Sequence, residues 1–270
     1  IEAMSIEQQL VEQPFKFRMG MSKGSLDYFR TNDRDAIYEK RTMLADLFVS
    51  DEATDPFEFV YFGATKECFQ AIDELLDIVM LLPNFAASET NRLFALSRST
   101  EADLIFLDKD LRIVGQSVFF QSHWEPHYKF GKLIGEVHEA IPGLNNKLGS
   151  TIEEFLRRLP ADSKTVYERT NIGFSQVADR NQSPKRKIPR LTDLKTSYVR
   201  VEEQGLMKLA KSEYVVFGIK IRSIPFLEFI KDDSSRKGIK MLIETMPDEV
   251  KSYKGISSEI AKEMVELCAQ

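Results

Sequence analysis

Cysteine, histidine and tryptophan are scarce in this chain of 270 residues, and long apolar runs are missing. The two cysteines, Cys68 and Cys268, lie too far apart in sequence to indicate a disulfide framework or a zinc knuckle. We therefore expect free thiols in a reducing compartment. The longest uninterrupted apolar run, Ile78–Leu82, is far too short to cross a bilayer. The first residues show neither the basic nor the apolar segment of a signal peptide, so we expect a cytoplasmic protein without a membrane partner.

An excess of positive charge is also lacking. The formal net charge is −5. We therefore do not expect the protein to bind nucleic acid through general electrostatic attraction. Apolar residues make up 43% and charged residues 29% of the chain, values typical of a soluble globular protein. This composition excludes disordered and collagenous classes.

Several catalytic signatures are absent as well. The sequence contains no GxGxxG, no GxxxxGK[ST], no GxSxG and no CxxC motif. Nucleotide-dependent redox chemistry is therefore not expected from this chain, and nicotinamide or flavin would have to act from elsewhere.

Apolar periodicity predicts helices in the first hundred residues. One is expected over 34–49, a second from Phe69 to just before Pro83, and a third after Ser88. The C-terminal part, 225–270, is also expected to be helical.

The central part changes to the period of strands. Strands are expected over 103–107, 111–120, 164–177, 196–204 and 213–222. Helices are expected over 126–138 and from a capping box at Ser150-Thr-Ile-Glu153, with an apolar stripe formed by Ile152, Phe155, Leu156 and Leu159. This order predicts an α+β fold, an antiparallel sheet with flanking helices. We expect a helical region over 1–100, a core over 101–225 and a helical region over 226–270, together forming one compact unit.

A polar loop over 179–193 contains the run Ser183–Arg190, in which Lys185, Arg186 and Lys187 lie between two prolines and Arg190 follows the second. Two interpretations stay open, a solvated mobile loop and a docking patch for an acidic partner.

All three histidines lie within sixteen residues of one another. His123 and His127 do not match a zinc-protease helix, because Pro126 lies between them and the glutamate is misplaced. A zinc site that also uses His138 remains possible. His138 alone fits either a core histidine or an axial haem ligand.

The surroundings of His138 resemble a known family. The central segments are Trp124, Lys129-Phe-Gly131, Val137-His138 and Ile141-Pro-Gly143. Further segments are Pro14-Phe15, Met19-Gly20, Glu39-Lys-Arg41, Arg169-Thr-Asn171, Arg200-Val-Glu-Glu-Gln204, Phe217-Gly-Ile-Lys-Ile221 and Tyr253-Lys-Gly255. In order and spacing they resemble the haem-dependent oxidative N-demethylase family, over residues of about 14–256.

The resemblance implies a PAS-like sheet that binds haem b. It also implies oxidation of a small methylated amine such as dimethylamine by O2. The N-methyl group would be hydroxylated to a carbinolamine, which releases formaldehyde. Electrons would come from NAD(P)H through a separate reductase subunit that carries flavin and iron–sulfur groups.

The resemblance also suggests roles for individual residues. His138 would be the axial iron ligand and thus the metal-binding residue. Lys129, Arg169 and Arg200 would pair with the haem propionates, because cationic side chains bind carboxylates. Trp124 would form a wall of the haem site or belong to the core.

The predicted strand around Arg200 adds candidate catalytic residues. Arg200, Glu202 and Gln204 would share one face if no bulge intervenes. Glu202 could bind an alkylammonium or move protons, and Gln204 could hold substrate or water. Asn171 is a weaker candidate. Ile172 replaces the family's tryptophan, which would reshape the pocket if it lies there or only repack the core.

Two other readings of function stay open. The chain could be a haem-binding PAS-type sensor or carrier without turnover. It could also be a haem-free ligand-binding or scaffold protein of the same fold. Formation of a homo-oligomer is possible in each case.

Overall fold

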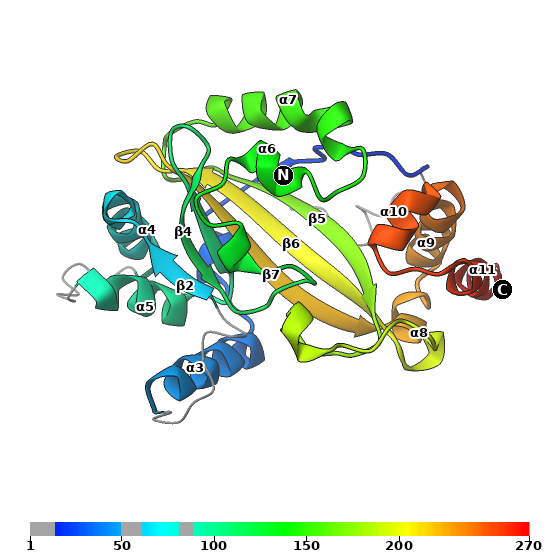
Figure 1. The fold of residues 1–270 in the computed structure, drawn as a ribbon. Coiled ribbons are helices and arrows are strands. Elements are labelled where there is room, and N and C mark those ends of the chain that lie inside the picture. The colour runs from blue at the N-terminus through cyan, green and yellow to red at the C-terminus, as the bar shows by residue number, and fades with distance from the viewer. Residues whose placement is uncertain (1–13, 50–60, 81–88, 270) are drawn as a thin grey trace.

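The structure is a computed structural model that describes residues 14–49, 61–80 and 89–269. Its centre is a seven-stranded antiparallel sheet with the order β1-β5-β6-β7-β3-β4-β2 (Figure 1). The strands are β1 (Ser22–Gly24), β2 (Tyr61–Ala64), β3 (Asp103–Leu107), β4 (Ile113–Val118), β5 (Val166–Ser175), β6 (Tyr198–Lys208) and β7 (Val215–Pro225). The predicted α+β class is confirmed.

Helices flank this sheet on both faces and at one end (Figure 1). They are α2 (Asp27–Arg30), α3 (Arg34–Val49), α4 (Phe69–Met80), α5 (Glu89–Ser99), α6 (Ile134–His138), α7 (Leu144–Arg158), α8 (Phe226–Phe229), α9 (Asp233–Thr245), α10 (Asp248–Tyr253) and α11 (Ser258–Cys268). Short 3₁₀ turns are η2 (Lys66–Cys68), η3 (Pro126–Tyr128), η4 (Pro184–Arg186) and η5 (Leu194–Thr196). The three helices predicted in the first hundred residues are confirmed, although Pro83 and Ser88 lie outside the described residues.

The five predicted strands are all present, the first with the predicted bounds and the other four with shifted ends. The second begins at Ile113 instead of residue 111, because Leu111 has a left-handed φ of 64° and belongs to the turn. Asp108 builds that turn, since its Oδ1 accepts hydrogen bonds from the N–H groups of Asp110 and Arg112.

The helix predicted over 126–138 is wrong. The segment instead contains η3, a turn with Gly131 at φ 78°, and then the short helix α6. Its middle pairs with the start of β4, since Gly131 N–H donates to Ile113 O and Ile113 N–H donates to Lys132 O, each at 2.9 Å. This pairing breaks the helix and sets His138 at the end of α6.

The capping box predicted at Ser150 is also wrong. Helix α7 begins earlier, at Leu144, directly after Gly143 with its φ of 73°. Ser150 is therefore an interior helical residue. The expected apolar stripe does face the protein, because Leu156 and Leu159 are buried and Ile152 and Phe155 pack against the same cluster.

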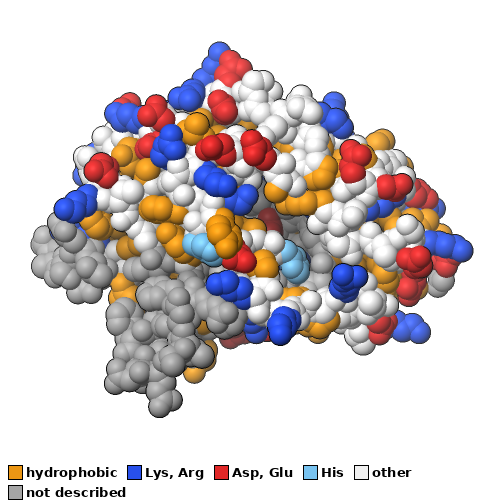
Figure 2. All heavy atoms as spheres, in the orientation of Figure 1, with side chains coloured by type: hydrophobic (Ala, Val, Ile, Leu, Met, Phe, Trp, Pro, Cys, Tyr) orange, Lys and Arg blue, Asp and Glu red, His pale blue; other side chains and the backbone are white. Residues whose placement is uncertain are grey.

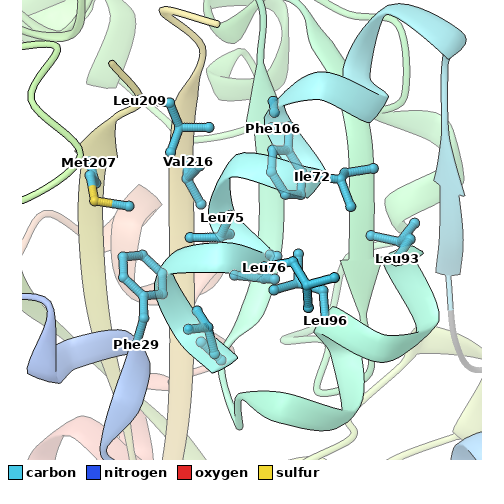
Figure 3. Packing of buried hydrophobic residues seen from close by; sticks show 14 of the residues in the cluster. Phe29, Ile72, Leu75, Leu76, Leu93, Leu96, Phe106, Met207, Leu209 and Val216 are labelled. Carbon is cyan, nitrogen blue, oxygen red and sulfur yellow. The ribbon is translucent and has the colours of Figure 1, made fainter. Parts of the chain in front are cut away.

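The two faces of the sheet have separate apolar cores. Helices α2, α4 and α5 cover one face through Phe29, Ile72, Leu75, Leu96 and their neighbours on the strands (Figure 3). The opposite face packs beneath α6 and α7 in a second cluster. A third cluster joins β5 and β6 to the C-terminal helices.

Helix α3 buries a charged side chain in its apolar stripe. Ala36, Lys40 and Leu44 are buried at successive four-residue intervals. Lys40 is fully buried, and its Nζ lies 3.6 Å from a carboxylate oxygen of Asp103. Burial lowers the pKa of Lys40 to about 8, and the charge of Asp103 opposes this shift.

In the described ranges, none of the helices combines the length and the apolar character that a membrane crossing would require.

Candidate functional site

Polar side chains gather on one face of β5 and β6. The strands pair Arg169 with Gln204, Asn171 with Glu202 and Gly173 with Arg200. Directly opposite residues share a face, so Arg200, Glu202 and Gln204 lie together there as strand alternation predicted. No bulge interrupts their register.

Glu202 lies at the centre of this face. Its Oε2 accepts hydrogen bonds from Asn171 Nδ2 at 3.1 Å and from Gln204 Nε2 at 3.0 Å. The two amides therefore orient the carboxylate and leave Oε1 without a hydrogen-bond partner among the described residues.

Three cations surround Glu202 without touching it. Its negative charge acts to raise the pKa of Arg169, Arg200 and Lys254, against the larger lowering effect of burial at each. Yet no basic nitrogen of the described ranges lies within the 4.0 Å of an ion pair with Glu202. Glu202 and these three cations therefore lie close enough to affect one another's charge but do not form ion pairs.

Arg200 has structural partners. Its guanidinium donates to Ser122 Oγ and to four backbone carbonyl oxygens, those of Phe120, Gln121, Asp179 and Arg180. Only 3% of the residue is exposed. Burial lowers its pKa to about 10. These contacts hold the segment after β4 against the 179–183 loop. The guanidinium is therefore bonded within the protein and is not free to pair with a haem propionate as we expected.

Arg169 is the reverse case. Its Nε is buried and makes no hydrogen bond to any described residue. Burial lowers the pKa of Arg169, while Glu202 acts in the other direction. A guanidinium nitrogen that is buried without an acceptor is costly, so Arg169 points to an anionic partner outside the protein chain.

His138 lies near Arg169 and Lys129. Burial first, and then the charges of Lys129 and Arg169, lower the pKa of His138 to about 4. The imidazole is therefore neutral at pH 7, the form that binds metals. Lys129 Nζ donates to Val137 O at 2.9 Å and so fixes the end of α6 beside His138.

An apolar wall lies beside these groups. Trp124, Phe130 and Val137 are partly buried and pack against the same cluster beneath α6 and α7. Trp124 therefore belongs to the wall and to the core at once. Figure 2 shows a hollow near the centre of this side of the molecule, over β5 and β6 as drawn in Figure 1, with histidine beside it.

The site also receives residues that sequence reasoning left without a role. Lys254, just after α10, donates from Nζ to Ile172 O at 2.7 Å. The pKa of Tyr253 is raised by partial burial and by the charge of Glu202. His123 has a positive φ of 59°, and its pKa is lowered by burial and Arg200 while Glu202 opposes this. The Tyr253-Lys-Gly255 motif was the available signal for the first two residues.

Ile172 lies on the opposite face of the sheet. It pairs with Val201, one residue out of phase with Glu202, and packs against the C-terminal cluster. The departure from the family's tryptophan is therefore a change of core packing and leaves the polar face unaltered.

The three histidines do not form a metal cluster. Among the residues that the structure describes, no three His, Cys, Asp or Glu side chains come together in a metal-binding group. His127 instead lies 3.4 Å from Glu125 and stacks near Tyr128.

The basic loop is anchored at its base. Asn181, Gln182 and Ser183 are buried, and Arg186 pairs with Asp179 at 3.0 Å. Lys185, Lys187 and Arg190 remain exposed. The docking interpretation of this loop stays a prediction.

Comparison with known families bears on this geometry. Residues 34–263 match the family described as haem-dependent oxidative N-demethylase, alpha subunit-like. The chain belongs to this family. No curated protein matches the sequence at a significant level. The resemblance drawn from the sequence motifs is therefore confirmed for most of the chain.

The chemistry of the demethylase-family residues fits a haem. A neutral imidazole is available at His138, the half-buried Arg169 has a buried Nε without an acceptor, and a tryptophan-containing apolar wall lies nearby. An iron ligand, a propionate partner and a wall for a flat ring are the three things that such a group requires.

Proposed function

We propose that this protein is the haem subunit of an oxidative N-demethylase acting on a small methylated amine. The observation that supports it best is the pairing of a neutral, half-buried His138 with the unpartnered Arg169 beside it. His138 would hold the iron of haem b, and Arg169 with Lys129 would face the propionates. When bound, the haem would supply O2 activation for oxidation of the N-methyl carbon.

The polar face would bind the amine. Glu202 offers Oε1 to the substrate ammonium while Asn171 and Gln204 hold its Oε2 in place. Gln204 would thus orient the carboxylate, in addition to any contact with the substrate. Arg200 would act as a positioning residue, because it fixes the strand that carries Glu202 to two neighbouring loops.

The overall reaction would convert N–CH₃, O2, two electrons and two protons into N–H, formaldehyde and water. The two electrons would come from NAD(P)H through a separate flavin and iron–sulfur reductase subunit. The family description as an alpha subunit supports a partner of this kind. We place the protein in the cytoplasm, with a PAS-like core formed by β3 to β7.

The test is the visible absorption spectrum of protein produced with a haem supply. We expect a Soret band that His138→Ala removes or displaces, whereas His127→Ala, at an exposed histidine, leaves it unchanged. Wild-type protein should then release formaldehyde from a methylated amine when a reductase supplies electrons. A Soret band without formaldehyde would favour a haem sensor or carrier, and no haem binding at all would overturn the proposal.

A further inference from the structure

Glu202 and Lys254 form a separated pair of opposite charges. The charge of Glu202 acts to raise the pKa of Lys254, but the two side chains form no ion pair within 4.0 Å. Glu202 is held by two amides from its own sheet, and Lys254 by a carbonyl of β5. The sheet thus holds the carboxylate and the ammonium group apart, so that neither neutralises the other directly.

Lys254 has few partners in the described protein. Its side chain is half-buried, and its single hydrogen bond among the described residues goes to Ile172 O. An ammonium group has three N–H donors, so two have no acceptor in the described protein.

Three cationic side chains respond to the charge of Glu202. Arg169, Arg200 and Lys254 are near it, whereas it is the one carboxylate whose charge acts on all three. A simple dialkylammonium ion would gain from Glu202 but would leave Lys254 unpaired. A ligand with both an ammonium and a carboxylate would complement both ends of the separated pair.

We propose that the substrate is a methylated amine that also carries a carboxylate, such as an N-methylated amino acid. Its ammonium binds Glu202 Oε1, and its carboxylate binds Lys254 Nζ. This inference rests on the proposed function for the chemistry, but the binding site itself does not depend on it. Lys254 is then a residue that determines specificity.

Calorimetric titration of the haem-loaded protein with three probes tests this assignment. The probes are N-methylglycine, dimethylamine and acetate, which carry both charges, the positive charge alone and the negative charge alone. We expect N-methylglycine to bind at least tenfold more tightly than either of the others. Equal or tighter binding of dimethylamine would overturn the inference.

Variants locate the effect. Lys254→Met should weaken N-methylglycine binding at least tenfold and leave dimethylamine binding unchanged or tighter, whereas Lys254→Arg should retain most of the affinity. Lys251→Met is the matched control on α10, because Lys251 pairs with Asp248 and not with the site. Loss of affinity in that control as well, or no loss in Lys254→Met, would count against the assignment.

Two further readouts keep the outcomes apart. If Lys254→Met does not fold, as circular dichroism would show, Glu202→Gln tests the other end and should abolish the preference for N-methylglycine over acetate. If wild-type protein releases formaldehyde but prefers dimethylamine, the proposed function stands and this inference fails. If the protein takes up no haem, the same titration is made on it as purified, and binding of N-methylglycine through Lys254 would then support the inference while the demethylase proposal fails.

Discussion

Two groups of charged side chains in the described part of the chain are built differently. In the first, Lys40 pairs with Asp103 and Lys220 pairs with Glu101 at 3.2 Å, and backbone groups satisfy the remaining donors and acceptors. In the second, Glu202 lies among Arg169, Arg200 and Lys254 and touches none of them.

The difference separates structural charges from charges that await a ligand. Lys40 also donates to Ala102 O at 2.7 Å, and Asp103 accepts from Phe119 and Phe120 N–H, so this network is closed. The Glu202 group stays open, since Arg169 Nε has no acceptor and Glu202 has no ion pair among the described residues. Replacing any member of the closed network should lower stability strongly, because it leaves a buried partner without its bond. In the open group, replacing a side chain that has few bonds should lower stability less.

The largest expected effect is at Lys40. Lys40→Met should lower the free energy of unfolding by about 3–5 kcal/mol, because it leaves the Asp103 carboxylate buried without its partner. Urea denaturation measures this loss. Lys109→Met, which removes an exposed lysine paired with Glu213, should leave stability unchanged. A small loss at Lys40 would mean that the two groups of charges do not differ in the way described.

Arg200 should give the next largest effect, because within the open group it alone is fully bonded. Arg200→Met should cost roughly 2–4 kcal/mol of unfolding free energy, since several buried carbonyl oxygens lose their donor. Thermal and urea unfolding would both report it. In Arg222→Met, where an exposed arginine pairs with Glu203, we expect a change of less than about 1 kcal/mol.

His138 should make the free energy of unfolding depend on pH. Its pKa is about 4 in the folded state and near 6.5 in the unfolded chain, so the unfolded state binds the proton more readily. The stabilisation is therefore present above pH 6.5 and is lost as pH falls towards 4. Between pH 7 and pH 5 the haem-free wild type should lose about 1–2 kcal/mol more than His138→Gln. Parallel losses in the two proteins would contradict the neutral buried imidazole.

Glu202 should give the smallest effect on stability. Glu202→Gln is expected to change the unfolding free energy by less than about 1 kcal/mol, because no ion pair is broken. Its effect should be found in ligand binding instead. A loss as large as that of Lys40→Met would assign Glu202 to the structural group.

The sequence predicted the strands well and the connections poorly. Alternation placed Arg200, Glu202 and Gln204 on one face, because the period of a strand is fixed by its backbone geometry. The helix over 126–138 failed, because the pairing of Gly131 and Lys132 with Ile113 is a long-range contact that outweighs local periodicity. The family motifs supplied His138 and Glu202, which periodicity alone could not have distinguished from a core histidine and a surface carboxylate.

Other features of the molecule depend on contacts between residues that lie far apart in the sequence. Lys40 reads as a surface residue by type, and only its place between Ala36 and Leu44 reveals that it is buried. Lys254 reaches a carbonyl that lies 82 residues earlier in the chain. Arg200 finds its acceptors in two loops, Phe120–Gln121 and Asp179–Arg180, and no local pattern indicates either of them.

The hydrogen bond from Lys254 Nζ to Ile172 O joins two segments that the ribosome makes at different times. The ribosome makes a chain from its N-terminus, and folding can begin on the part already made. His138 and Arg169, with the strands around them, emerge well before residue 254. The side of the site assigned to the cofactor can therefore form on the nascent chain first, and the side assigned to the carboxylate is completed only when the last helices dock.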